Sequence, residues 1–249
     1  MKSSQILVAA AAILASAACN AEKNNRSSVT DAAEARPVPP PRGGDWTQRV
    51  TATAAGGFQM GNPNARVKLI EYGSMTCPHC REFDEKGAGP LIAKYVKSGR
   101  VAYEFRNYVR DPYDLAGALV TRCNGPATFF ALTRAMYKDQ VNWITKLQAV
   151  PAAQAQALSN LPPNRQFVEI GKLAGFQQWA AMRGVPSAKA NACLSNEAQV
   201  DRLVQMNSDA TTQFPDFQGT PTFVLNGQML KDTATWDTLE PQLRKAVGG

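Results

Sequence analysis

Apolar residues follow two different periods along this chain, and the change between them predicts its organisation. Residues 67–72 (Val-Lys-Leu-Ile-Glu-Tyr) and 101–108 are rich in β-branched and aromatic residues, which favours two strands. A helix is predicted from Cys77 toward Val96, with an interruption at residues 87–90, which contain two glycines and a proline. Strand, helix and strand in this order form a βαβ unit, whose strands pair in parallel.

The middle of the chain contains no strand pattern. From residue 111 to residue 209 the apolar positions recur at helical spacing, most clearly over 127–138, 165–176 and 188–207. We therefore predict an all-helical insertion over residues 111–209.

Strand patterning returns near the end of the chain. Residues 222–226 predict a strand, Asn226-Gly227 is typical of a type I′ hairpin turn, and residues 228–230 predict the partner strand. A closing helix is expected over 235–247. The predicted fold class is α/β, with the helical insertion lying between the second and third core strands of one domain made of residues 56–110 and 210–249.

The first 18 residues predict an export signal. Lys2 supplies a positive charge, residues 6–14 form a short apolar run, and small residues follow over 15–18. The run is too short for a permanent membrane span. Export predicts a periplasmic protein in an oxidising compartment, where cysteines pair.

Residues 19–55 are polar and rich in proline, which predicts a disordered tether. Cys19 directly follows the signal and has two interpretations. It is either lipidated, which anchors the protein to the membrane as a lipoprotein, or it is a loose thiol. Lipidation would leave four of the five cysteines for two pairs. However, Ser16 stands where lipoproteins usually carry leucine.

Composition narrows the possible partners. The 249 residues are 44% hydrophobic, enough for a substantial core, and the formal net charge is +7. The basic residues are dispersed and form no block with interleaved aromatics, so we expect no nucleic-acid partner.

The candidate chemistry centres on Cys77-Pro78-His79-Cys80, which contains the only histidine of the chain. A thiolate at a helix N-terminus is stabilised by free backbone N–H groups and by the helix dipole. A histidinium beside it would add positive charge. The motif therefore predicts a low-pKa Cys77 and an oxidising disulfide. Zinc is the alternative, but it needs a second ligand pair at close spacing; we expect no metal and no cofactor.

Two further segments accompany the dithiol. Glu71 lies six residues before Cys77 on the preceding strand. If that strand is central, Glu71 is buried and its raised pKa suits proton transfer to Cys80; otherwise it is an exposed strand residue. Gly219-Thr220-Pro221 precedes a strand, and a cis Thr220-Pro221 bond would face the thiols and pair its backbone with a substrate peptide.

These elements resemble the DsbA family of thiol:disulfide oxidoreductases, which have a thioredoxin fold with a helical insertion. The resemblance runs from about Phe58 to the C-terminus. Its matching residues are Cys77-Pro78-His79-Cys80, Glu71 at the buried-acid position, Phe83 on the active helix, and Thr220-Pro221 at the cis-proline loop. The chain departs from the family in carrying Thr220 where classical members often have valine, and Tyr103 where some have lysine.

The resemblance implies a mechanism and partners. An exposed Cys77 is the nucleophile that forms the mixed disulfide, a buried Cys80 resolves it, and His79 stabilises the Cys77 thiolate. The implied substrates are unfolded exported proteins with free cysteines. The implied reoxidising partner is a quinone-linked membrane enzyme of the DsbB type.

Cys123 and Cys193 lie in the predicted insertion. They are either two separate buried thiols or a structural disulfide, which the compartment favours. Closing a loop of this length would stabilise the fold by about 4 kcal/mol on the chain-entropy argument.

Three function classes follow. The first is an oxidase, and the second is an isomerase or reductase of the DsbC or DsbG type. Those isomerases dimerise through an N-terminal domain, and residues 20–57 are too short and too polar for one, so we expect a monomeric oxidase. The third is a non-catalytic peptide-binding chaperone.

Overall fold

The computed structural model describes residues 37–40 and 44–248. The predicted export signal (residues 1–18), Cys19 and residues 20–36 of the predicted tether lie outside the described residues. Among the described residues, no helix has both the length and the apolar character to cross a bilayer.

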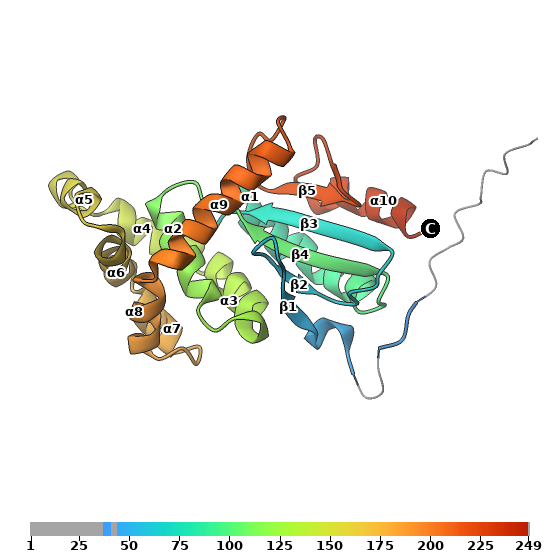
Figure 1. Ribbon diagram of the computed structural model, residues 1–249, viewed down its shortest axis with the longest axis horizontal. Coiled ribbons are helices and arrows are strands. Elements are labelled where there is room, and N and C mark those ends of the chain that lie inside the picture. Colours follow the sequence, from blue (N-terminus) through green and yellow to red (C-terminus); the bar gives the residue numbers. More distant parts are fainter. Residues whose placement is uncertain (1–36, 41–43, 249) are drawn as a thin grey trace, which may run out of the picture. The chain divides into compact units, whose positions relative to one another are not determined.

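A six-stranded mixed sheet has the strand order β1-β2-β4-β3-β5-β6 (Figure 1). Only β3 and β4 pair in parallel; the other neighbours are antiparallel. The predicted βαβ unit is therefore confirmed, and β3 is central. The strands are β1 (Val50–Ala52), β2 (Phe58–Met60), β3 (Val67–Gly73), β4 (Val101–Asn107), β5 (Thr222–Leu225) and β6 (Gln228–Met229).

The helix after β3 is not broken at residues 87–90: the backbone is helical from residue 78 to residue 96, with π-helical hydrogen bonding on either side of Gly89 and Pro90. It begins as α1 (Pro78–Phe83) and continues as two π-helical segments, η2 (Asp84–Ala88) and η3 (Leu91–Val96). Pro90 lacks the N–H that regular α-helical hydrogen bonding would use here. A Cβ on Gly87 would lie 2.7 Å from the Phe83 ring, so the close approach of the two turns requires glycine.

The predicted helical insertion contains eight helices on one side of the sheet in Figure 1, and the last one ends at Gln213, four residues beyond the predicted boundary. Its apolar faces join the core of the sheet. The helices are α2 (Pro112–Arg122), α3 (Pro126–Lys138), α4 (Gln140–Gln148), α5 (Ala152–Ser159), α6 (Pro163–Ala174), α7 (Phe176–Ala181), α8 (Ser187–Leu194) and α9 (Glu197–Gln213).

The C-terminal elements follow the prediction. Asn226 and Gly227 both have positive φ (49° and 84°) and connect β5 to β6, as a type I′ turn requires. Helix α10 (Trp236–Ala246) is capped by Thr235 and buries Leu239 and Leu243.

The predicted boundary of the tether is wrong. Residues 44–55 belong to the domain, because they include η1 (Trp46–Gln48) and β1, which pairs with β2. The Trp46 ring is buried, and its Nε1 donates a hydrogen bond of 2.7 Å to the Val38 carbonyl. The short strand was missed because its signal is only three residues long and prolines and glycines precede it.

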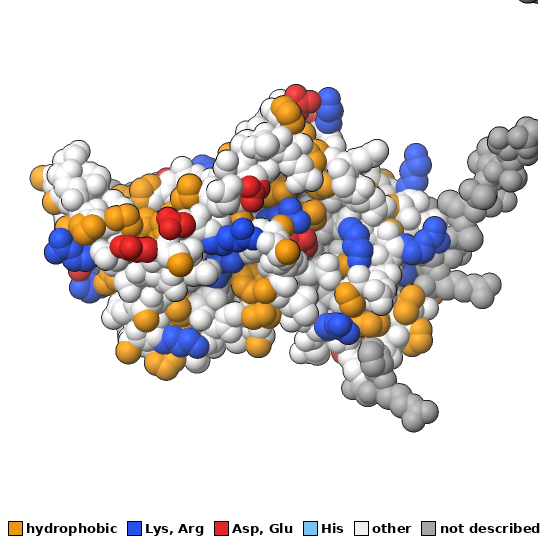
Figure 2. Space-filling model, viewed as in Figure 1, with side chains coloured by type: hydrophobic (Ala, Val, Ile, Leu, Met, Phe, Trp, Pro, Cys, Tyr) orange, Lys and Arg blue, Asp and Glu red, His pale blue; other side chains and the backbone are white. Residues whose placement is uncertain are grey.

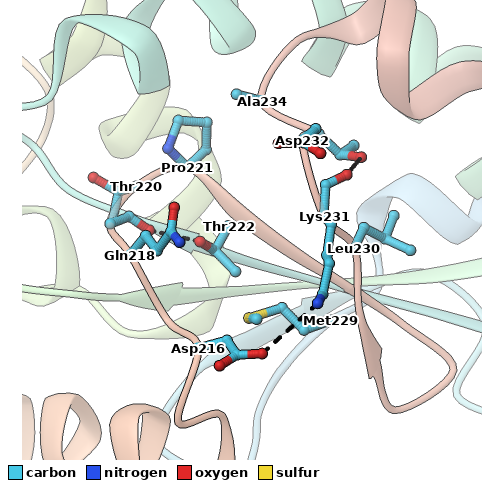
Figure 3. Close-up of a pocket in the computed structure, with 12 residues that line it drawn as sticks. Asp216, Gln218, Thr220, Pro221, Thr222, Met229, Leu230, Lys231, Asp232 and Ala234 are labelled. Atoms are coloured by element: carbon cyan, nitrogen blue, oxygen red, sulfur yellow. Dashed lines mark hydrogen bonds and ion pairs between the residues drawn. The ribbon is translucent and has the colours of Figure 1, made fainter.

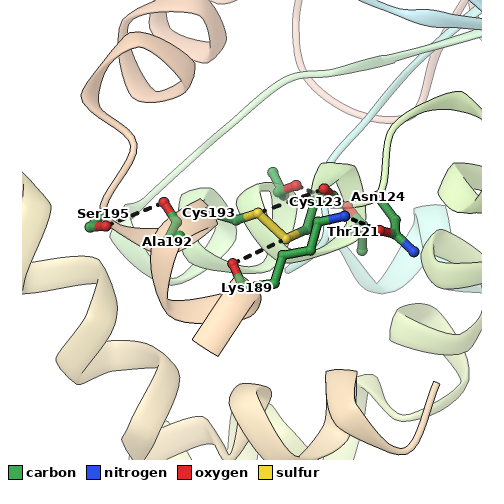
Figure 4. The surroundings of a disulfide bond; sticks show 8 residues. Thr121, Cys123, Asn124, Lys189, Ala192, Cys193 and Ser195 are labelled. Carbon is green, nitrogen blue, oxygen red and sulfur yellow. Dashed lines mark hydrogen bonds between the residues drawn. A yellow bond between two sulfur atoms is a disulfide. The ribbon is translucent and has the colours of Figure 1, made fainter. Parts of the chain in front are cut away.

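Cys123 and Cys193 form a disulfide in the structure (Figure 4), with their Cα atoms 5.5 Å apart. Cys123 follows the last residue of α2 and Cys193 lies in α8, so the bond joins two helices of the insertion. On the face drawn in Figure 2, the Lys and Arg side chains are scattered over several elements rather than gathered into one patch.

Candidate active site

The two cysteines of the motif are free thiols at the start of α1, in the position that the sequence predicts. Pro78 and His79 are exposed, whereas Cys77 is 1% and Cys80 0% exposed. The prediction of an exposed Cys77 is therefore wrong. The cis-proline loop covers its sulfur, and Cys77 Sγ donates a hydrogen bond of 3.1 Å to the Thr220 carbonyl.

The surroundings lower the pKa of Cys77 to about 5. The largest cause is the Cys80 side chain, whose S–H stabilises the thiolate; Thr220 and the backbone N–H groups of Cys80 and His79 add to this, while burial opposes it. Above this pKa Cys77 is a thiolate, and the hydrogen bond that its sulfur donates to the Thr220 carbonyl belongs to the protonated thiol.

His79 contributes to this set through its backbone N–H. Its imidazole is 72% exposed, and Nδ1 lies 4.0 Å from Glu82 Oε2. A role of the imidazole charge in stabilising the thiolate stays a prediction.

Cys80 behaves in the opposite way. Burial raises its pKa well above the ordinary value, and the Cys77 thiolate and Glu71 raise it further, while the Ser74 backbone N–H lowers it. The pair therefore consists of one thiolate and one thiol. This asymmetry suits a nucleophile and a resolving thiol.

Glu71 is buried in the central strand, at 2% exposure. Burial raises its pKa to about 8, against the effect of a hydrogen bond that it accepts from the Tyr103 hydroxyl. The buried alternative for Glu71 thus holds. Tyr103 lies on β4, and its hydroxyl is the hydrogen-bond partner of the Glu71 carboxyl group.

Asp84 is a second acid near Glu71, and no local sequence pattern singles it out. It follows α1, four residues after Cys80, and its pKa is raised to about 6, mainly by burial. Arg134 Nε lies 3.6 Å from its Oδ1. A small cavity is lined in common by Glu71, Asp84, Tyr103 and Arg134.

The Thr220-Pro221 bond is cis, as the motif predicted. The Thr220 carbonyl faces Cys77. The buried side-chain hydroxyl of Thr220 has no hydrogen-bond partner among the described residues. Gly219 precedes it with a φ of 153°, which favours glycine. This loop therefore places a backbone carbonyl and a free hydroxyl group beside the sulfur.

A pocket of about 570 Å³ opens on the outer side of this loop (Figure 3). The cis-proline loop forms one wall, and the segment from Met229 to Ala234 forms the other. An exposed ion pair of 3.8 Å joins Lys231 and Asp216 across it. Because β6 ends the sheet on this side, its outer edge is open to pairing with an extended peptide.

The described residues contain no group of three or more His, Cys, Asp or Glu side chains arranged to hold a metal ion.

The family model for thioredoxin matches residues 53–245. This chain belongs to the thioredoxin family. A crystal structure of a protein-disulfide isomerase from Novosphingobium aromaticivorans superposes on this thioredoxin-family chain with a TM-score of 0.73. The two sequences are 36% identical, and the match covers 77% of this chain and 97% of the isomerase chain. Wolbachia pipientis alpha-DsbA1 shares the fold at 21% identity and a TM-score of 0.61, covering 76% of this chain and 90% of its own. The predicted resemblance to DsbA proteins and the predicted fold class are confirmed.

Curated relatives of this thioredoxin-family chain are longer. A protein of Rickettsia bellii named "Putative protein-disulfide oxidoreductase" is 28% identical over 169 residues, which cover 68% of this chain and 56% of the relative. A protein of the same name from Rickettsia felis is 28% identical and is covered to 62%. The chain thus spans less than two thirds of either relative.

Proposed function

We propose that this protein is a thiol:disulfide oxidoreductase that donates its Cys77–Cys80 disulfide to exported proteins with free cysteines. The observation that carries the proposal is the opposite shift of the two thiol pKa values, to about 5 for Cys77 and well above the ordinary value for Cys80. A stabilised Cys77 thiolate favours the reduced dithiol, and this makes the disulfide a good oxidant.

The reaction proceeds in two exchanges. A client thiolate attacks Cys77 Sγ, the Cys77–Cys80 bond breaks, and Cys80 leaves with the electron pair. Glu71 is protonated at neutral pH because its pKa is about 8, so it supplies the proton that Cys80 takes up. A second client thiolate then attacks the client sulfur of the mixed disulfide and releases Cys77 as a thiolate. The client loses two electrons and the dithiol gains them.

The pocket beside the cis-proline loop supports client binding. An extended segment of the client pairs with the backbone before Pro221 and lies along the edge of β6. Such backbone pairing is independent of sequence, which suits an enzyme that acts on many unfolded proteins. Cys77 becomes accessible when the client displaces the Thr220 contact.

Location and partners belong to the same proposal. The export signal predicted for residues 1–18 supports a periplasmic protein, either free or anchored as a lipoprotein through Cys19. Reoxidation by a quinone-linked membrane enzyme of the DsbB type would complete the cycle, and the enzyme acts as a monomer.

The alternative is a disulfide isomerase. Two observations favour it: the isomerase named among the similar structures, and Thr220 before the cis-proline. The redox equilibrium separates the two functions, because an oxidase holds a disulfide that glutathione reduces easily.

The test uses the mature protein and a reduced, unfolded client with two cysteines. The wild type should form the client disulfide stoichiometrically, and Cys77→Ser should abolish this. Cys80→Ser should trap the mixed disulfide when a preformed client disulfide is offered. If the oxidised wild type leaves the client reduced but the reduced wild type rearranges scrambled client disulfides, the isomerase is correct. Client folding assisted equally by Cys77→Ser would indicate a chaperone.

A further inference from the structure

Side chains of the helical insertion hold the loop that carries the dithiol. Residues 74–77 join β3 to α1, and Ser74 and Met75 are fully buried. The polar groups of a buried loop need partners. Here Asp114 of α2 and Gln140 of α4 supply them.

Asp114 is the third residue of α2 and is 0% exposed. Its carboxylate accepts hydrogen bonds from Ser74 Oγ (2.5 Å) and the Met75 backbone N–H (2.7 Å), and also from the Arg110 N–H (2.9 Å). Burial raises its pKa to about 7, and these donors act against that rise. A buried carboxyl group that accepts hydrogen bonds from this loop and from the segment before α2 fixes the positions of both relative to the helix.

Gln140 is the first residue of α4 and is 2% exposed. Its Nε2 donates to the carbonyls of Met75 (2.7 Å) and Cys77 (3.0 Å). The Cys77 carbonyl also accepts the first hydrogen bond of α1, from the Arg81 N–H at 3.2 Å. Gln140 therefore holds the loop at the residue that bears the nucleophilic sulfur.

Two further contacts tighten this junction. Asp111, the cap of α2, accepts a hydrogen bond of 3.1 Å from Thr76 Oγ1. A Cβ on Gly117 would lie 3.2 Å from the Met75 Cβ, so glycine lets α2 approach the loop closely. The insertion thus contacts each residue from 74 to 77.

The loop in turn supplies groups to the sulfurs. The Ser74 backbone N–H is the group that lowers the Cys80 pKa against burial. The position of Cys77 at the start of α1 gives its sulfur the backbone N–H groups of His79 and Cys80. Displacement of the loop would change both sets of contacts.

We propose that Asp114 and Gln140 are positioning residues for the dithiol, through which the helical insertion sets the redox equilibrium of Cys77 and Cys80. Neither side chain touches a reacting atom. The inference deepens the proposed function, since it assigns part of the tuning to the insertion rather than to the motif.

The test compares Asp114→Asn and Gln140→Leu with the wild type. The readouts are the thiolate absorbance of the reduced protein as a function of pH and the equilibrium with glutathione. Loss of a hydrogen bond that positions a charged group should shift the equilibrium constant about fivefold to tenfold toward the disulfide, with a matching rise of the Cys77 pKa.

Matched controls separate positioning from stability. Gln177→Leu removes an amide that bonds the Val168 carbonyl and Asn191 within the insertion, and Glu104→Gln changes a buried carboxylate that pairs with Arg106. Neither contacts the loop, so both should leave the equilibrium within about twofold of the wild type. Ser74→Ala, which removes only one donor to Asp114, replaces Asp114→Asn if that variant does not fold.

The inference would be overturned if the glutathione equilibria of Asp114→Asn and Gln140→Leu fell within the range of the two control variants. Both readouts are independent of any client protein. A wild type that fails to oxidise clients would therefore contradict the proposed function without affecting this result.

Discussion

At the scale of single residues, the environment rather than the residue type decides the chemistry. Cys77 and Cys80 belong to one turn, yet the pKa of the first is lowered and that of the second is raised. The first receives hydrogen bonds from its surroundings, and the second is enclosed by apolar side chains and by the negative charge of its neighbours. Thr220 takes part in this difference from a position remote in the sequence.

Thr220→Val should raise the Cys77 pKa. The Thr220 side chain lowers that pKa, and its buried hydroxyl has no hydrogen-bond partner among the described residues. Valine keeps the shape but removes the donor, which predicts a rise of about one unit. Thiolate absorbance between pH 3 and pH 9 measures it. Thr220→Ser, which retains the hydroxyl, is the control; equal titration of both variants would refute the role of this group.

Glu71→Gln should change the pH dependence of stability. The pKa of Glu71 is about 8 in the folded protein and near 4.5 in the unfolded chain. Between these values the folded state holds a proton that the unfolded state has lost, so folding is progressively disfavoured as the pH rises from about 5 to 8. The Glu71→Gln variant has no such titration. Its free energy of unfolding relative to that of the wild type should therefore increase as the pH rises over that range.

Urea unfolding of the reduced proteins at pH 5, 7 and 9 provides the measurement, with Glu104→Gln as the control glutamate. Glu71→Gln should also slow the release of Cys80 in exchange with a client at pH 7, because glutamine cannot supply a proton. A constant stability difference across the three pH values would show that Glu71 does not titrate as described.

At the scale of elements, the two ends of α2 have different tasks. Its N-terminal turn holds the active-site loop through Asp114, while Cys123 at its C-terminal end joins α8 through the disulfide. The contact through Asp114 affects the position of the two active-site sulfurs, and the disulfide affects the stability of the insertion.

The double variant Cys123→Ala, Cys193→Ala should therefore lose stability without a change in redox behaviour. The bond closes a loop of 70 residues, so its removal should lower the free energy of unfolding by about 4 kcal/mol. Urea unfolding and the glutathione equilibrium are the two measurements. A shifted glutathione equilibrium together with an unchanged free energy of unfolding would contradict this structural role of the Cys123–Cys193 disulfide.

At the scale of the whole molecule, the features that sequence predicts are those encoded locally. The dithiol, Glu71 on its strand, the hairpin at Asn226-Gly227 and the cis-proline each depend on a few neighbouring residues. The contacts that were missed join distant segments. Asp114 and Gln140 reach the loop from 39 and 65 residues away in the chain. Burial of Cys77 depends on a carbonyl 143 residues away, which no local pattern records.

The attachment of residues 37–40 has a consequence for how the molecule presents its dithiol. The Val38 N–H bonds the Ser98 carbonyl at 2.9 Å, next to the start of β4, whereas Cys77 follows the end of the parallel strand β3. A strand of seven residues separates these two ends of the sheet by roughly 20 Å. The contact made by residues 37–40 thus lies at the end of β3 and β4 opposite to Cys77. A peptide bound beside Cys77 would therefore not compete with the contact between Val38 and Ser98.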